Sequence, residues 1–182
     1  MEKPIGSLKN FTSNDEALVS EFIELIHEYL AIDEVNEMRH YFQHLNTSRL
    51  QHCINVAYYT FLACKRLDLN VRSATIAALF HDFYLYDWKN NEQPIEGRHS
   101  VVHPQVALQN ARKYVETDAI MEDCILNHMW PMSPQHPLTK EGWVVQGADK
   151  ICAIMELGKQ SYRILTPVRM KRLMLTAITA QY

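Results

Sequence analysis

The sequence contains little glycine, only five residues among 182, and almost no stretch in which apolar and polar residues alternate. Strict alternation is the pattern of a half-buried strand, whereas most apolar residues here recur at spacings of three and four, as in amphipathic helices. The chain also contains no internal repeat, low-complexity tract or linker. These features predict an all-α, single-domain helical bundle, which suits a chain of this length.

Other absences exclude whole classes of function. No run of 18 apolar residues occurs and the N-terminal residues contain no apolar core of a signal peptide, so we expect a cytoplasmic protein that neither spans a membrane nor is secreted. A net charge of −3 provides no basic field for a nucleic-acid polymer. The four cysteines lack CxxC spacing and lie among apolar residues, which predicts reduced, buried thiols.

Helical periodicity and capping residues predict the boundaries of most helices. The expected helices are 15–31; a short one containing Val35, Met38, Phe42 and Leu45; a third opening at Thr47 or Ser48; 73–86; a fifth with Pro104 as its first residue and His103 beside it; a sixth from Thr117 to His128; a seventh from Thr139 to Gly158; and a last one from Pro167 onward.

Nine histidines are the main peculiarity of the composition, and one of them lies in LFHDFYLYDW, residues 79–88. Here His81 and Asp82 stand among apolar residues, on the face of the predicted helix 73–86 that points into the bundle. Burying an unpaired carboxylate costs much free energy, so the pair needs a strong partner. That partner is either a metal ion or another side chain in a hydrogen-bonded core pair, and this segment alone leaves both open.

Three further polar residues lie on or beside the apolar faces of their own predicted helices: His52, His128 and Asp149. A single inward histidine is more often a hydrogen-bonded core residue than a ligand. Four separate helices that each direct a histidine or an aspartate into the same interior favour a metal instead. Imidazole and carboxylate ligands suit iron, manganese, nickel, cobalt or zinc, and the absence of thiolates argues against a structural zinc site.

The order of these residues resembles the H…HD…D signature of the HD superfamily of metal-dependent phosphohydrolases, over about residues 47–157. The resemblance implies an all-α fold around one or two divalent transition-metal ions. It also implies that residues 1–46 form an N-terminal helical extension, 47–157 the core and 158–182 a C-terminal helix. The residues that match the family's core metal ligands are His52, His81, Asp82 and Asp149.

Two more histidines lie between the HD pair and the last aspartate. His103 and His128 are similar to the extra ligands of the binuclear branch of the superfamily, in which Asp82 would bridge two ions. The segments HDFYLYDW, HSVVHP, HMWP and ADK also resemble a group of small, uncharacterised bacterial HD proteins. The resemblance implies catalysis at His81 and Asp82, where metal-activated water attacks a phosphomonoester or phosphodiester of a small, nucleotide-like substrate.

The sequence also departs from the patterns of several relatives. The lysine of the common HDIGK continuation is missing from HDFYL, so Lys89 or Arg98 would have to contact substrate phosphate. The GYP signature of cyclic-dinucleotide phosphodiesterases is absent. Leu85 and Tyr86 stand where alarmone hydrolases of the superfamily place a Glu-Asp pair, which argues against that activity.

Two other candidates for substrate binding are His99 and Lys150. His99 is expected in a loop, near the substrate or a second metal, and not in a helical pair with His103, because Pro104 should begin the helix. Lys150 either reaches phosphate or extends into solvent. Candidate hydrogen-bond partners for the ligand imidazoles are Asn55, Asp87 and Asn127.

The sequence leaves two other classes of function open. One is a sensing or signalling module that keeps the metal pocket without turnover, since a fold does not guarantee an activity. The other is a helical interaction domain whose inward histidines and aspartates bond to one another. A homodimer is compatible with each of these alternatives.

Overall fold

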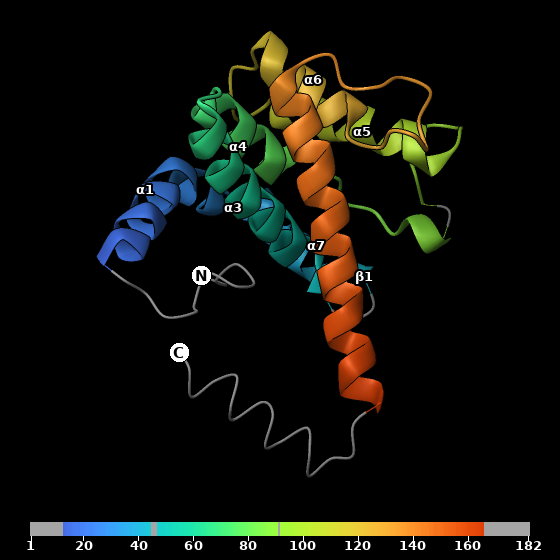
Figure 1. Cartoon of the computed structure of the whole chain (residues 1–182). Coiled ribbons are helices and arrows are strands. Elements are labelled where there is room, and N and C mark those ends of the chain that lie inside the picture. Colours follow the sequence, from blue (N-terminus) through green and yellow to red (C-terminus); the bar gives the residue numbers. More distant parts are fainter. Residues whose placement is uncertain (1–12, 45–46, 91, 166–182) are drawn as a thin grey trace.

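The structure of the protein is a computed structural model that describes residues 13–44, 47–90 and 92–165. The described residues form seven α-helices (Figure 1). Their bounds are α1 Ser13–Leu30, α2 Asp33–Glu37, α3 Arg49–Leu67, α4 Val71–Phe80, α5 His99–Ala111, α6 Ala119–Asn127 and α7 Lys140–Leu165. Shorter elements connect them: the 3-10 helices η1 Met38–His40 and η2 Trp88–Asn90, and the antiparallel strands β1 Phe42–His44 and β2 Thr47–Ser48. The all-α prediction is confirmed.

Helix α3 lies at the centre of the bundle. It packs along α4 and also against α7, while α6 contacts both α4 and α7, and α5 packs on α6 (Figure 1). The core between these helices contains fully buried side chains such as Phe22, Ile26, Phe61, Phe80 and Ile125. Burial of each such side chain stabilises the fold by about 1.5–3 kcal/mol.

Polar caps fix where three helices begin. The Ser48 hydroxyl accepts a hydrogen bond from the Gln51 amide at 3.2 Å, which confirms the predicted start of α3. Asn70 caps α4 in the same way. Asp118, one residue after the predicted Thr117, caps α6 by accepting from the Met121 amide at 2.8 Å.

The prediction that the fourth helix continues to Tyr86 is wrong, because α4 ends at Phe80. His81 is the C-cap residue, and the amide of Tyr84 donates to the carbonyl oxygen of Asp82 in a tight turn. The buried guanidinium of Arg49 stabilises this non-helical path, since it donates to the carbonyl oxygens of Tyr84 and Tyr86. The His-Asp pair therefore lies at the end of a helix.

Three other predicted helix boundaries differ from the structure. Phe42, expected in the second helix, lies in β1, where it pairs with Ser48. Helix α5 begins five residues before Pro104, which it accommodates at the loss of one main-chain hydrogen bond. Helix α7 continues past Gly158.

Some of the remaining predictions are confirmed, and others concern residues outside the described part of the chain. All four cysteines are buried free thiols, as expected. Among the described residues, no helix has the length and apolar character needed to cross a membrane. The predicted helix after Pro167 lies outside the described residues. The division at residues 46 and 157 stays a prediction, although α7 crosses the second of these points without a break.

Candidate metal centre

All six predicted metal ligands meet in one buried cluster formed by α3, α5, α7 and the ends of α4 and α6. Their side chains are His52, His81, Asp82, His103, His128 and Asp149. Two triplets each bring one ligand atom from every member within 4.8 Å of the others. The triplets are His52 with His81 and Asp149, and His81 with Asp82 and His128. His81 belongs to both, so the two groups are neighbours.

Main-chain carbonyl groups orient three of the histidines. In His81, His103 and His128, Nδ1 lies 2.7 Å from the carbonyl oxygen of a residue one turn earlier in the chain. A carbonyl only accepts, so Nδ1 carries the proton and, in a neutral imidazole, Nε2 carries a lone pair. The Nε2 atoms of His103 and His128 lie 3.1 Å apart. Two lone pairs at that distance repel each other unless a cation or a proton lies between them.

Asp82 lies among these imidazoles. Its Oδ1 atom is 3.1 Å from His103 Nε2 and 3.6 Å from His128 Nε2, and its Oδ2 atom is 3.6 Å from His81 Nε2. Among the described residues, neither Asp82 Oδ1 nor His81 Nε2 has a hydrogen-bond partner, although both are buried. Buried polar atoms are rarely left in this state, and these two are the donor types that divalent transition metals prefer. The cluster therefore fits a metal ion.

The other half of the cluster contains an additional carboxylate, Glu156, which was not among the predicted site residues. His52 Nε2 lies 3.1 Å from Asp149 Oδ1, and its Nδ1 lies 3.0 Å from Glu156 Oε2. Glu156 is 1 % exposed and accepts a further hydrogen bond from Asn55 at 2.8 Å. A carboxylate behind a ligand imidazole fixes the ring and makes it a stronger ligand. Asn55, a predicted partner of the ligand imidazoles, thus donates to the carboxylate that contacts His52.

The sequence does contain a signal for Glu156. Asp149, Cys152 and Glu156 are spaced by three and four residues, so they share the inward face of α7. A glutamate on an apolar helix face, two turns after a candidate ligand, is as conspicuous as an inward histidine.

The two halves of the cluster shift the pKa values of their histidines in opposite directions. Burial would lower the pKa of His52, but the carboxylates of Asp149 and Glu156 raise it to about 10. Burial, reinforced by the imidazoles of His81 and His103, lowers the pKa of His128 to about 3. Without a cation, His128 is therefore a neutral imidazole with a free lone pair at physiological pH. Burial opposes ionisation of Asp82, yet the imidazoles of His81 and His103 hold its pKa well below the usual range.

The predicted substrate-binding residues are placed unequally. Lys150 lies at the cluster, where Nζ donates to Asp149 Oδ2 at 3.0 Å and to the His128 carbonyl oxygen at 3.2 Å. His99 is half-buried beside the cluster, and its ring stacks on that of His103 with the ring centres 4.5 Å apart. Lys89 and Arg98 are exposed, in η2 and immediately before α5.

The expectation that His99 and His103 do not form a helical pair is wrong. Both lie in α5, one turn apart, because the helix begins at His99 and not at Pro104. Two other predicted partners of the imidazoles bond elsewhere. Asn127 donates to Asp123 at 2.7 Å, and Asp87 accepts from the amide of Lys89 at 3.0 Å, which is the capping bond of a turn.

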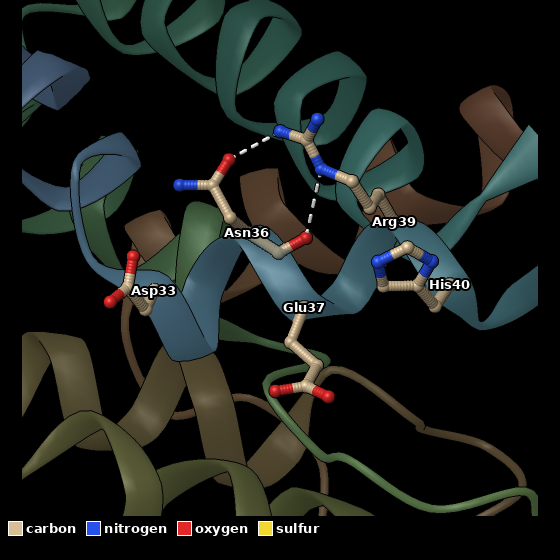
Figure 2. A pocket seen from close by; sticks show the side chains of 5 residues that line it. All are labelled: Asp33, Asn36, Glu37, Arg39 and His40. Atoms are coloured by element: carbon tan, nitrogen blue, oxygen red, sulfur yellow. Dashed lines mark hydrogen bonds between the residues drawn. The ribbon is translucent and has the colours of Figure 1, made fainter.

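A surface pocket of about 460 Å³ is separate from this cluster. It lies over α2 and η1 and is lined by Asp33, Asn36, Glu37, Arg39 and His40 (Figure 2). Asn36 and Arg39 are joined there by two hydrogen bonds, from the Arg39 guanidinium to the side-chain and main-chain oxygens of Asn36 (Figure 2). None of the predicted site residues lines this pocket.

Comparison with known proteins agrees with this geometry. The family model described as HD domain matches residues 49–154, more than half of the chain. The protein therefore belongs to the HD domain family, as its motif order predicted. No solved structure matches the chain.

The curated relatives are much longer proteins. Ribonuclease Y of Clostridium perfringens strain SM101 is 33 % identical over 104 residues, which are 57 % of this chain and 18 % of that protein. Ribonuclease Y of Petrotoga mobilis is 34 % identical over 86 residues, 47 % of this chain and 16 % of that protein. The matched region thus spans less than a fifth of either relative.

Proposed function

We propose that the protein is a metal-dependent phosphohydrolase that cleaves a phosphomonoester or phosphodiester of a small, nucleotide-like substrate. The observation that supports this most directly is the pair of buried ligand atoms at the centre of the cluster, Asp82 Oδ1 and His81 Nε2, which have no hydrogen-bond partner in the described part of the chain. When bound, a divalent transition-metal ion supplies hydroxide at neutral pH and neutralises charge on phosphoryl oxygens.

The donor set is sufficient for one or two ions. His52, His81, Asp82 and Asp149 would hold the first, and Asp82 with His103 and His128 would hold a second. The main-chain bonds at Nδ1 and the contact between His52 and Glu156 keep every Nε2 directed inward. The nitrogen and oxygen donors suit iron, manganese, nickel, cobalt or zinc. Lys150 adds a positive charge at the same place, suited to a phosphate.

An aromatic stack beside the cluster supports a nucleotide-like substrate. The ring of Trp88 stacks on that of His99 at 4.9 Å with an interplanar angle of 10°, and His99 stacks in turn on His103. Trp88 is 39 % exposed. A nucleobase that stacks on an aromatic ring gains about 1–3 kcal/mol. A phosphate at the cluster and a base on Trp88 would thus use adjoining parts of the protein.

The proposal is tested with purified protein loaded with Mn²⁺. The substrates are nucleoside monophosphates, an aryl phosphodiester and a short RNA, the last because the curated relatives are named ribonucleases. We expect turnover of a small substrate, with loss of metal and activity in His81→Ala. The matched control is His136→Ala, which removes an exposed histidine. Cleavage of RNA alone would contradict the proposed substrate class.

The same experiment separates the alternatives. Full metal occupancy without turnover of any substrate would favour a sensing or signalling module. Protein that binds no metal at all would favour a helical interaction domain in which the histidines and carboxylates bond only to one another.

A further inference from the structure

Arg49 is a buried charge next to the cluster that the proposed chemistry does not use. It is the first residue of α3, one turn before His52, and is 1 % exposed. Its guanidinium lies 3.5 Å from the centre of the Tyr84 ring and donates to the carbonyl oxygens of Tyr84 and Tyr86. These contacts offset the cost of burying the charge. They also fix the guanidinium relative to the segment that follows the His-Asp pair.

The guanidinium determines how the Gln43 side chain is oriented. Arg49 Nε donates to Gln43 Oε1 at 3.2 Å, and the Tyr84 hydroxyl donates to the same oxygen at 3.4 Å. A guanidinium has no acceptor, so Gln43 must present its oxygen to Arg49 and its NH₂ group in the other direction. In that direction, Gln43 Nε2 donates to Asp82 Oδ2.

This hydrogen bond fixes the rotation of the Asp82 carboxylate. With Oδ2 bonded to Gln43, Oδ1 is directed at the imidazoles of His103 and His128, where it has no hydrogen-bond donor among the described residues. A carboxylate free to rotate would point a different oxygen at these rings for part of the time. The bond also reaches Asp82 from β1, outside the 49–154 region that matches the family model.

We propose that Arg49 and Gln43 are positioning residues that hold Asp82 Oδ1 in the orientation needed to bind a metal ion, an inference that rests on the proposed function. Neither residue needs to touch substrate for this role. Arg49 acts through the orientation of the Gln43 amide, and Gln43 acts through a single hydrogen bond to Asp82. Loss of either should therefore change the metal centre itself, and not only the rate of the reaction.

The test uses Co²⁺, because its visible absorption bands report on the geometry of its ligands. We expect Gln43→Leu to weaken Co²⁺ binding about 10- to 100-fold, the usual effect of removing a partner of a metal ligand, and to change the spectrum. The control Gln109→Leu, at an exposed position of α5, should leave both unchanged. Circular dichroism and thermal unfolding without metal establish that each variant is folded.

A second variant separates orientation from charge. Arg49→Lys keeps the positive charge but loses the planar fork that orients Gln43. We expect it to shift the Co²⁺ spectrum as Gln43→Leu does. The double variant, which combines the two changes, should bind Co²⁺ no more weakly than the weaker of the single variants. An unchanged affinity and spectrum in folded Gln43→Leu would overturn the proposal. If Arg49→Lys raised only KM, with an unaltered spectrum, the role of Arg49 would be refuted.

Failure of the proposed function would look different. In that case, wild-type protein would itself bind no Co²⁺, or would bind it and turn over no substrate, whereas failure of the positioning role requires normal Co²⁺ binding by wild type and by Gln43→Leu alike.

Discussion

Asp82 and Asp123 are both buried aspartates with a lowered pKa, yet their surroundings differ in one respect. Asp123, in α6, accepts from Asn127 and from the amides of Leu138 and Thr139, at 2.7 to 2.9 Å, and from the Thr139 hydroxyl. Both of its oxygens are thus bonded to protein donors. Asp82 accepts from Gln43 on Oδ2, and its Oδ1 has no donor among the described residues.

Burial and a low pKa therefore do not by themselves identify a metal ligand. Both carboxylates are ionised, because each has neighbours that favour the charged form. The supply of hydrogen-bond donors distinguishes them: at Asp123 the protein supplies donors to both oxygens, whereas at Asp82 one oxygen faces imidazole nitrogens and accepts no hydrogen bond from the described residues. A buried acceptor without a donor costs about 1–3 kcal/mol, more when it is charged. A cation bound at Asp82 would remove that cost. At Asp123 both oxygens already accept hydrogen bonds, so a cation would remove no such cost there.

The largest effect is expected for Asp82→Ala. The change removes a carboxylate that would help to hold either ion, and metal catalysis contributes several kcal/mol to stabilisation of the transition state, so activity should fall about 10³-fold or more. Metal analysis of the purified variant should show loss of at least one ion per chain. The metal-free variant should still unfold cooperatively, because Asp82 supports no helix terminus. Metal content equal to that of wild type would remove the distinction between the two aspartates.

Glu156 is an intermediate case, since its donors are protein groups but one of them is a candidate ligand. Glu156→Ala should weaken metal binding about 10- to 100-fold, because His52 loses the carboxylate that orients its ring. Competition with a chromogenic chelator measures the change. Glu122→Ala is a suitable control, since Glu122 lies on α6 and accepts hydrogen bonds from Arg112 and Thr117, away from the cluster. Equal affinity in the two variants would assign Glu156 a structural role only.

The candidate ligand residues are predictable from sequence because each lies on the inward face of a regular helix or at its end. Helical spacing places His52, His128 and Asp149 in the interior, the surrounding apolar run identifies His81 and Asp82, and the family resemblance adds His103. His103 is predicted correctly as a residue of the cluster although its position in α5 is not, since that helix starts at His99 and contains Pro104 in its interior.

What could not be predicted depends on contacts between distant segments. Gln43 reaches Asp82 because β1 pairs with β2, and no periodicity relates residues 39 positions apart. Helix α4 stops at Phe80 although the apolar pattern continues, because a charge in α3 binds the carbonyl groups of the next segment. Asp123 gains its donors from Leu138 and Thr139, about 15 residues later, and its place in α6 gives no hint of them.

A smaller effect, on stability and not on function, is expected for Asp123→Asn, which keeps the size of the side chain but not its charge. The amide group would present a donor to the donors of Leu138 and Thr139 at the start of α7, so we expect the free energy of unfolding to fall by about 1–3 kcal/mol. Metal content and activity should match those of wild type. Urea unfolding of the metal-free proteins at neutral pH measures the difference. Loss of metal in this variant would show that the two aspartates do not have separate roles.

The smallest effect is the change with pH of the difference in unfolding free energy between wild type and Asp123→Asn. Burial would raise the pKa of Asp123, but hydrogen bonds from Thr139, Leu138 and Asn127 lower it in the folded protein. A carboxyl group with a depressed folded pKa stabilises the fold above its unfolded pKa, about 4, and this contribution is lost as the pH falls through the folded value. The gap in unfolding free energy between wild type and Asp123→Asn should therefore be constant from about pH 7 to pH 5 and shrink below about pH 4. Both proteins share every other titrating group, so only Asp123 contributes to the difference. A gap that widens on acidification would mean that the protonated side chain, and not the carboxylate, is the form that holds Thr139 in place.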